Sequence, residues 1–323
     1  MENKQKAIGV LTSGGDAPGM NSAIRAVVRA ALHKNMRVIG IRRGYSGLLA
    51  HDMFEMNLRS VSDTLHRGGT MLYSARCPEF RDDKGVERGK EACLQAGIDG
   101  LVVIGGDGSF RGARDLSLKG IPCIGLPGTI DNDIASSDYT IGFDTAVNTV
   151  MDMVDKLRDT SQSHDRCSIV EVMGRRCGDI ALHAGIACGA VSILVPEVPF
   201  SIDAIVEKMQ RTLRTGKKHF IIIVSEGVID ANELANQIQA ATGVDSRATV
   251  LGHIQRGGSP TVRDRVNASL MGYHAIDLLD KGIYNRVVAV SGDKIVDYDV
   301  NVALSMHKTI DRDMIEIANT ISI

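Results

Sequence analysis

Short apolar runs alternate with segments of helical periodicity along the whole chain. Most of these runs are rich in Val and Ile and show little alternation between apolar and polar positions, as parallel strands covered on both faces do. Such an alternation of strands and helices predicts an α/β fold with doubly wound, largely parallel sheets. The predicted strands are Ala7–Leu11, Arg37–Ile41, Leu101–Ile104, Cys123–Leu126, Ser168–Val172, Val191–Val195, Phe220–Val224, Ala248–Leu251 and Val287–Val290.

The helical segments and the chain length bear on domain organisation. The clearest predicted helix is Phe143–Arg158, because its apolar residues form one stripe. A weak similarity relates Ile8–Asp16 to Ser168–Asp179, since each runs from a strand through glycine to an aspartate. Two related α/β halves fit this similarity, although chance resemblance explains it as well. A length of 323 residues also predicts two domains, at about 150 residues each.

The composition excludes several classes of function. A net charge of -2 provides no basic field for nucleic acid or an anionic membrane, and the lack of Trp disfavours stacking on bases. No apolar run approaches the ~20 residues of a membrane span, and the run Ile8–Leu11 is too short for a signal peptide. The six cysteines have no metal-type spacing, so we expect reduced thiols and a cytoplasmic protein.

The candidate sites are the loops after the strands, because ligands of open α/β sheets bind beyond the carboxyl ends of the strands. The first loop, Thr12–Asn21, contains two glycines and a proline before a predicted helix, and its backbone N–H groups suit an anion. A tight turn without a ligand explains this loop about equally well. The chain has no GxxxxGK[ST] string, so the loop is not of the Walker type.

Two further loops carry aspartates. The loop Gly105–Ser109 places Asp107 between glycines, and a carboxylate beside a polyphosphate requires a cation between them. Asp107 is therefore predicted to be a Mg²⁺ ligand. In the loop Pro127–Asp133, one of Asp131 and Asp133 could accept a proton from an attacking hydroxyl while the other helps to hold Mg²⁺ through water. Ordinary turns are the alternative for both loops.

Basic residues recur near other strand ends. In a chain of slightly negative net charge, arginines gathered there would form a local anion site, because guanidinium groups bind phosphate through bidentate hydrogen bonds. Ordinary salt bridges are the alternative for any single arginine. Glu226 suits either hydrogen bonds to sugar hydroxyls or a helix cap. The basic candidates are Arg76, Arg166, Arg175, Arg247, His253 and Arg256.

Several strings occur in the order in which one enzyme family carries them, and on these the chain resembles the bacterial ATP-dependent 6-phosphofructokinases from about Lys6 to Ile323. The resemblance implies two similar Rossmann-like three-layer domains. The larger would bind ATP with residues 1–142 plus 255–305, and the smaller would bind a sugar phosphate with residues 143–254 plus 306–323. The strings are TSGGDAPGMN (Thr12–Asn21), GGDGS (Gly105–Ser109), PGTIDND (Pro127–Asp133), MGR (Met173–Arg175) and GHIQRGG (Gly252–Gly258).

The resemblance implies transfer of the γ-phosphoryl group of MgATP to the 1-hydroxyl of fructose 6-phosphate. Asp131 would deprotonate the hydroxyl, and Thr129 and Arg175 would lie at the transferred group. Asp107 would hold Mg²⁺, with Asp133 assisting. The ATP site would contain Gly15, Tyr45, Arg76, Cys77, Gly106, Asp107, Gly108 and Ser109. The sugar-phosphate site would contain Thr129, Asp131, Met173, Gly174, Arg175, Glu226, His253 and Arg256, with Arg166 and Arg247 from a neighbouring subunit of a homotetramer.

The resemblance also bears on the donor and on regulation. Relatives that use pyrophosphate carry Asp at the position of Gly108 and Lys at that of Gly128, so glycine at both favours ATP. The family's effector site, which binds ADP as activator and phosphoenolpyruvate as inhibitor, is matched only in part. Val191 replaces a Glu, Thr215 a Lys and Leu58 an Arg, although Arg59 is adjacent, so we expect an altered response. The matching residues are Arg25, Arg29, Asp63, Arg158, Lys217, Lys218 and His219.

Other hypotheses share single features with this one. NAD kinases and lipid kinases carry a similar Gly-Gly-Asp-Gly string, but Asp131 and Asp133 together with His253 and Arg256 disfavour them. Other sugar phosphates stay open as acceptors. A sensor without catalysis would lack the Asp131 carboxylate. A dehydrogenase would need G-x-G-x-x-G, whereas Gly106–Gly112 has the spacing G-x-G-x-x-x-G.

Overall fold

The computed structural model describes residues 5–322 of the chain. Contacts divide the chain into two compact units. The larger unit comprises Met1–Ile130, Ile134–Thr145 and Arg256–Lys308. The smaller unit comprises Asp131–Asp133, Ala146–Gln255 and Thr309–Ile323.

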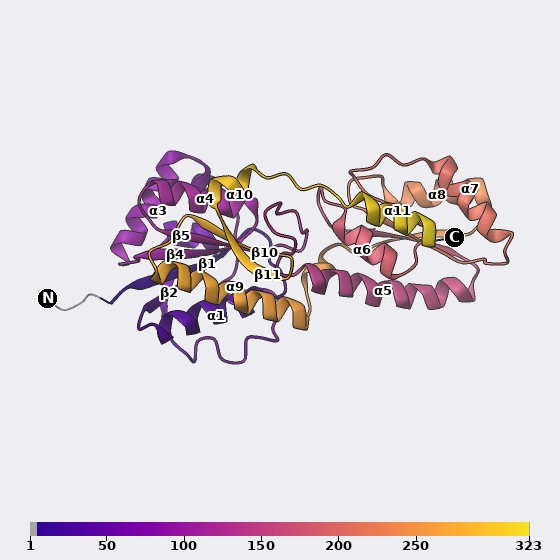
Figure 1. The fold of residues 1–323 in the computed structure, drawn as a ribbon. Coiled ribbons are helices and arrows are strands. Elements are labelled where there is room, and N and C mark those ends of the chain that lie inside the picture. The colour runs from indigo at the N-terminus through magenta and orange to yellow at the C-terminus, as the bar shows by residue number, and fades with distance from the viewer. Residues whose placement is uncertain (1–4, 323) are drawn as a thin grey trace. The chain divides into compact units, whose positions relative to one another are not determined.

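The larger unit is built on a seven-stranded sheet with the order β11-β10-β5-β4-β1-β2-β3 (Figure 1). Its five inner strands run parallel, and the edge strands β3 and β11 run antiparallel to their neighbours. Because β5, β4 and β1 are adjacent, the loops that follow them lie next to one another at the carboxyl edge. The strands are β1 (Ala7–Ser13), β2 (Arg37–Ile41), β3 (Met53–Met56), β4 (Gly100–Gly105), β5 (Cys123–Pro127), β10 (Arg286–Ser291) and β11 (Lys294–Asp299).

Helices cover both faces of this sheet (Figure 1). On one face α1 packs along α9, and on the other α4 packs against α3 and α10, while α2 packs against α3. A short 3-10 helix, η1 (Pro78–Arg81), precedes α3. The helices are α1 (Met20–His33), α2 (Gly44–Leu49), α3 (Asp83–Gln95), α4 (Asp107–Leu118), α9 (Val262–Asp280) and α10 (Val300–Ser305).

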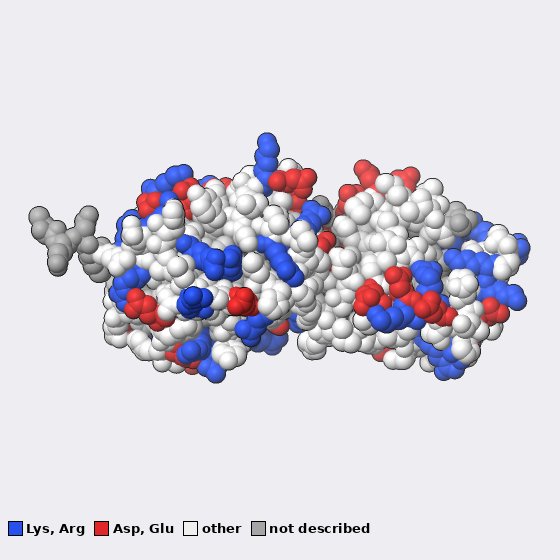
Figure 2. Space-filling view, turned by 90° about the horizontal axis from the view of Figure 1, so that it is seen from below, with Lys and Arg blue, Asp and Glu red and all other residues white. Residues whose placement is uncertain are grey.

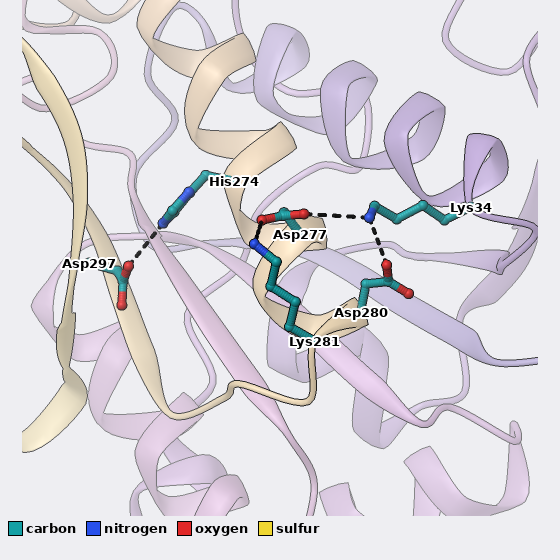
Figure 3. Close-up of polar contacts among 6 residues, drawn as sticks. All are labelled: Lys34, His274, Asp277, Asp280, Lys281 and Asp297. Atoms are coloured by element: carbon teal, nitrogen blue, oxygen red, sulfur yellow. Dashed lines mark hydrogen bonds and ion pairs between the residues drawn. The ribbon is translucent and has the colours of Figure 1, made fainter.

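Ion pairs join the ends of α1 and α9 (Figure 3). Lys34, at the end of α1, places its Nζ 2.6 Å from Asp280 and 3.5 Å from Asp277 of α9. On the opposite side of α9, His274 Nε2 lies 2.9 Å from an Asp297 carboxylate oxygen on β11. These contacts attach α9 both to α1 and to the edge of the sheet.

The smaller unit contains four parallel strands in the order β7-β8-β6-β9. α7 and α8 pack together on one face, where their apolar residues form a core with the strands. α6 lies on the other face with α11 against it (Figure 1). The elements are α5 (Phe143–Ser163), β6 (Cys167–Val172), α6 (Asp179–Ala187), β7 (Ser192–Leu194), α7 (Ile202–Leu213), β8 (Phe220–Ser225), α8 (Ala231–Thr242), β9 (Ser246–Val250), the 3-10 helix η2 (Gly252–Arg256) and α11 (Arg312–Ile321).

The structure confirms the α/β class, all nine predicted strands and the predicted helix, which extends to Ser163 as α5. Sequence reasoning missed the two edge strands, β3 and β11. Both are partly exposed and paired on one side only, so polar residues interrupt their apolar positions and the pattern of a buried parallel strand is absent. No helix within residues 5–322 is long and apolar enough to cross a bilayer.

Candidate active site

The loop after β4 leads directly into a helix. Gly106 is the N-cap of α4, and Asp107 is its first residue. The first N–H groups of a helix have no partner inside it, so the start of α4 suits an anion. The Asp107 carboxylate is about half exposed and lies 3.7 Å from Arg111.

A single carboxylate at this helix terminus fits magnesium. Within residues 5–322 no group of three His, Cys, Asp or Glu side chains is placed to hold a metal alone. Mg²⁺ keeps several waters and is usually bound by one or two carboxylates together with substrate phosphates. Asp107 would therefore hold a magnesium ion that arrives with a nucleotide.

The glycines after β4 and after β5 have different surroundings. A Cβ added at Gly106 or Gly108 would meet nothing within 4 Å, whereas one at Gly128 would lie 3.0 Å from Ile104 and Met20 side-chain carbons. Protein packing therefore explains glycine at position 128 but not at 106 or 108.

Tyr45 lies beneath the same loop. Its side chain is buried, stacks on Phe80 and donates a hydrogen bond of 2.6 Å to the carbonyl of Ser109. Burial raises the pKa of the Tyr45 hydroxyl well above its usual value. The phenol is covered by η1 and α4 and supports the loop from beneath, and a position of Tyr45 near an adenine base stays a prediction.

The loop after β1 is joined to the last residue of η2. Arg256 Nη1 donates to the carbonyl of Asp16 at 3.2 Å, and a Cβ at Gly15 would collide with this nitrogen. Glycine at 15 thus leaves room for a guanidinium group. Arg76 is exposed, and Cys77 next to it is the N-cap of η1.

The loop with the predicted base is anchored by its middle residue. Asp131 is only 6% exposed. Asn132 has a left-handed backbone (φ 52°), and its Nδ2 donates to Asp179 Oδ2 at 2.7 Å. Asp133 lies 3.9 Å from Arg175 Nη1, while Thr129, just before the loop, accepts a hydrogen bond at its carbonyl from the Thr140 hydroxyl. Three of the four predicted catalytic residues are thus placed in the smaller unit.

Polar side chains hold the turn at the end of β6. Glu226 Oε1 accepts from the N–H groups of Gly174 at 3.2 Å and Arg175 at 2.7 Å. Gln255, which is fully buried, accepts from the Met173 N–H at 3.3 Å. Arg175 has a left-handed backbone (φ 61°), and these bonds hold the turn that aims its exposed side chain. His253 is exposed in η2 of the same unit.

Sequence reasoning missed the residues that hold these loops. Gln255 lies inside a motif that was recognised, and Asn132 lies between two of the aspartates. Asp179 shows no sequence signal for its contact with Asn132, since 47 positions separate them. Their neighbours were noticed because carboxylates and arginines suit chemistry, whereas amides and distant carboxylates become informative only in three dimensions.

Arg166 and Arg247 lie at the opposite edge of the smaller sheet from Met173 and Glu226. Arg166 precedes β6 and Arg247 is the second residue of β9, so both are at the amino ends of the strands. The six residues of β6 separate Arg166 from Met173, which corresponds to about 20 Å. Within one chain, Arg166 therefore lies at the far end of β6 from the residues of the carboxyl edge.

Several predicted effector residues share this amino edge. Lys217, Lys218 and His219 precede β8, and burial together with the charges of Lys217 and Arg158 lowers the pKa of His219. Figure 2 shows Lys and Arg side chains gathered at the end of the smaller unit where α5 ends. Val191 is buried, and Thr215 is exposed.

The remaining effector candidates belong to the larger unit. Arg25 and Arg29 project from α1, and partial burial together with the charge of Arg29 lowers the pKa of Arg25. Asp63 is exposed with a left-handed backbone, and Leu58 is 56% exposed.

Comparison with known proteins gives one consistent result. The Phosphofructokinase family model matches residues 7–279. A curated ATP-dependent 6-phosphofructokinase of Clostridium botulinum (strain Hall) is 55% identical over 317 residues, which cover 98% of this chain and 99% of the relative. The chain belongs to the phosphofructokinase family. The enzyme of the same name from Clostridioides difficile (strain 630) is 54% identical over 318 residues, covering 98% of this chain and all of the relative.

Solved structures of phosphofructokinases have the same fold. Phosphofructokinase from Saccharomyces cerevisiae matches with a TM-score of 0.87 at 35% identity, over 98% of this chain and 47% of the yeast chain. This chain thus spans about half the length of the yeast relative. A pyrophosphate-dependent phosphofructokinase from Marinobacter aquaeolei has a TM-score of 0.86 at 23% identity, over 95% of this chain and 86% of the other, which shows a shared fold.

Proposed function

We propose that this chain transfers the γ-phosphoryl group of MgATP to the 1-hydroxyl of fructose 6-phosphate, giving fructose 1,6-bisphosphate and ADP. Curated relatives that are 55% identical over nearly the full length carry the name ATP-dependent 6-phosphofructokinase, which supports the reaction. The observation that carries the residue assignment is the Asp131–Asp133 loop, where a buried carboxylate is followed by the Asn132–Asp179 anchor.

In this proposal the chain supplies a base and charge stabilisation. The Asp131 carboxylate takes the proton of the sugar hydroxyl, whose oxygen attacks the γ-phosphorus as the bond to the ADP oxygen breaks. Arg175 and Thr129 bind the transferred group, and Asp133 orients the Arg175 guanidinium from 3.9 Å. Phosphoryl transfer needs positioning and charge neutralisation more than covalent catalysis, and this set of residues fits that need.

The nucleotide assignment rests on the loops after β1 and β4. Gly15, Arg76, Cys77 and Gly106–Ser109 line the ATP phosphates in this proposal, and Asp107 holds Mg²⁺, which neutralises phosphate charge when it is bound. The open space at Gly108 supports ATP as the donor, because a carboxylate there would meet the α-phosphate. Position 128 carries less weight, since packing alone accounts for its glycine.

The sugar-phosphate assignment requires a second copy of the chain. Met173, Gly174, Glu226, His253 and Arg256 would bind fructose 6-phosphate within one chain. Because Arg166 lies about 20 Å along β6 from Met173, and Arg247 lies beside Ser168 near the same amino edge, both would serve the site of a neighbouring subunit. We accordingly propose the homotetramer of the family as the working assembly.

The finer organisation follows the same assignment. We propose two doubly wound, Rossmann-like halves, of which residues 1–142 plus 255–305 bind ATP and residues 143–254 plus 306–323 bind the sugar phosphate. The proposed compartment is the cytoplasm, where the six cysteines stay reduced.

An altered effector response completes the proposal. ADP and phosphoenolpyruvate would meet Arg25, Arg29, Asp63, Arg158 and Lys217–His219, whose cationic members suit a phosphorylated ligand. The buried Val191 offers no oxygen to a nucleotide-bound metal. Strong activation by ADP and strong inhibition by phosphoenolpyruvate in steady-state kinetics would contradict this expectation.

The central test is turnover of fructose 6-phosphate with MgATP and, in parallel, with magnesium pyrophosphate. We expect turnover with ATP only.

Asp131→Ser should lower kcat by roughly 10²–10⁴-fold, the usual share of general-base catalysis, with a much smaller change in KM. Asp203→Ser, an exposed aspartate of α7, is the matched control and should retain wild-type kcat. Near-wild-type turnover by Asp131→Ser refutes the assignment of the base.

A further inference from the structure

An aspartate joins the two arginines at the amino edge of the smaller sheet. Asp245 Oδ2 accepts a hydrogen bond of 2.6 Å from Arg166 Nε, and Asp245 Oδ1 lies 3.0 Å from Arg247 Nε. Each carboxylate oxygen therefore contacts one guanidinium group. Asp245 has no sequence signal for its contact with Arg166, since 79 positions separate them.

The backbone places the three side chains side by side. The Cys167 N–H donates to the Asp245 carbonyl at 2.9 Å, at the start of the parallel pairing of β6 with β9. The next register pair joins Ser168 to Arg247. Arg166 and Asp245 are thus neighbours because two adjacent strands begin there.

Most of the arginine donors remain available in this arrangement. A guanidinium group has five N–H donors, and the contacts of 2.6 Å and 3.0 Å with Asp245 are made by the Nε of each arginine. Among the described residues, neither guanidinium makes another hydrogen bond or ion pair. The terminal nitrogens can therefore meet a phosphate, and the Arg247 side chain is 69% exposed.

The carboxylate also makes the pairing of two cations possible. Two unpaired arginines at this spacing repel each other and occupy many rotamers. Binding of a ligand would then have to order both side chains, and the conformational entropy lost would weaken its affinity. The two arginines keep the pKa of Asp245 below its usual value, so the carboxylate stays ionised at neutral pH. One negative charge between two positive ones leaves a net positive pair for a phosphomonoester dianion.

We propose that Asp245 is a positioning residue that holds Arg166 and Arg247 as a preformed clamp for the phosphate group of the sugar substrate. This inference rests on the proposed function, because it concerns the same substrate. Asp245 acts through the arginines and does not touch the substrate. The alternative is that Asp245 competes with the phosphate for the arginines, which predicts the opposite change in affinity.

The test combines kinetics with a double-mutant cycle. Asp245→Asn should raise the KM for fructose 6-phosphate roughly tenfold, while kcat and the KM for ATP change less than about twofold. Asp245→Glu should recover part of the affinity. In an Arg166→Ala background, Asp245→Asn should raise the KM for fructose 6-phosphate by a much smaller factor than it does in the wild type. Glu207→Gln, an exposed carboxylate of α7 with no ion pair among the described residues, is the control and should be neutral.

The outcomes separate this inference from the proposed function. A wild-type chain that does not phosphorylate fructose 6-phosphate contradicts the function, and the clamp is then decided by calorimetric titration of inorganic phosphate into the wild type and Asp245→Asn. Equal phosphate affinity overturns the clamp in that case. If the wild type is active, an unchanged or lower KM in Asp245→Asn, or additive effects with Arg166→Ala, overturns the clamp alone.

Discussion

The candidate substrate-binding loops of the two units are held in different ways. In the larger unit, Gly106 and Gly108 leave open space at the start of α4, and the support lies beneath, where Tyr45 bonds to the Ser109 carbonyl. In the smaller unit, Glu226 and Gln255 bind the backbone at the end of β6. The larger unit thus presents backbone groups at the start of α4, which suits a phosphate chain. The smaller unit fixes the direction of side chains after β6, which suits recognition of a sugar.

The largest expected effect comes from removing the support of the smaller unit. Glu226→Ala leaves the N–H groups of Gly174 and Arg175 without the carboxylate oxygen that they share, and we expect a loss of about 1.5–3 kcal/mol in total, the contribution of one hydrogen bond to a charged group. We expect kcat/KM for fructose 6-phosphate to fall roughly 10–150-fold, with the KM for ATP nearly unchanged, in initial-rate assays.

Two controls test whether this loss belongs to the Glu226 carboxylate. Glu226→Gln keeps an acceptor without the charge and should recover part of the activity. Glu233→Gln, on the exposed face of α8, should behave as the wild type. A Glu226→Ala variant that loses ATP affinity as strongly as sugar-phosphate affinity would break the comparison between the units.

The comparison also explains what sequence could and could not predict. Parallel strands and glycine loops carry local signals, so the fold and the residues of the larger unit's loops follow from pattern and spacing. Supports act at a distance, since Glu226 is 51 positions from Arg175 and Gln255 is 82 from Met173. Tyr45 was noticed, but the sequence does not show that it lies beneath the loop instead of on its surface.

Asp264 of α9 can be compared with Glu226, because it is a carboxylate of the larger unit that accepts hydrogen bonds from backbone N–H groups. It accepts from the N–H groups of Gly142 at 2.8 Å and Thr145 at 2.9 Å and from the Thr145 hydroxyl. Unlike Glu226 it is fully buried, and burial raises its pKa to about 6. Its role is therefore expected in stability and not in substrate affinity.

The pH dependence of unfolding tests that difference. A folded-state pKa of about 6, above the unfolded value, means that the protonated group stabilises the fold below about pH 4 and that this contribution is lost as pH rises through 6. The free energy of unfolding of the wild type relative to Asp264→Asn should therefore fall by ~1–2 kcal/mol between pH 5 and pH 7 in urea titrations. Parallel profiles for the two proteins would show that Asp264 does not titrate in this range.

A charge added to the open loop of the larger unit should affect the nucleotide alone. Gly108→Asp places a carboxylate where the structure leaves space, and repulsion from the phosphates should lower kcat/KM for ATP about tenfold. Gly108→Asn has nearly the same size without the charge and should lose much less. Equal losses in the two variants would point to crowding instead of charge, and a matching loss for fructose 6-phosphate would contradict the division between the units.

The smallest expected effects are changes in stability when Gly108 or Gly128 is replaced by alanine. They distinguish a glycine required by a ligand from a glycine required by packing. Gly108 is exposed within α4 and meets no neighbour, so Gly108→Ala should stabilise the fold by about 0.5–1 kcal/mol while weakening ATP binding. Gly128→Ala should instead destabilise by about 1 kcal/mol, because its Cβ would press on Ile104 and Met20. Thermal unfolding without ligand measures both changes, and ATP titration measures the binding. If Gly108→Ala is stabilising and binds ATP as the wild type does, the open space at Gly108 has no ligand-binding purpose.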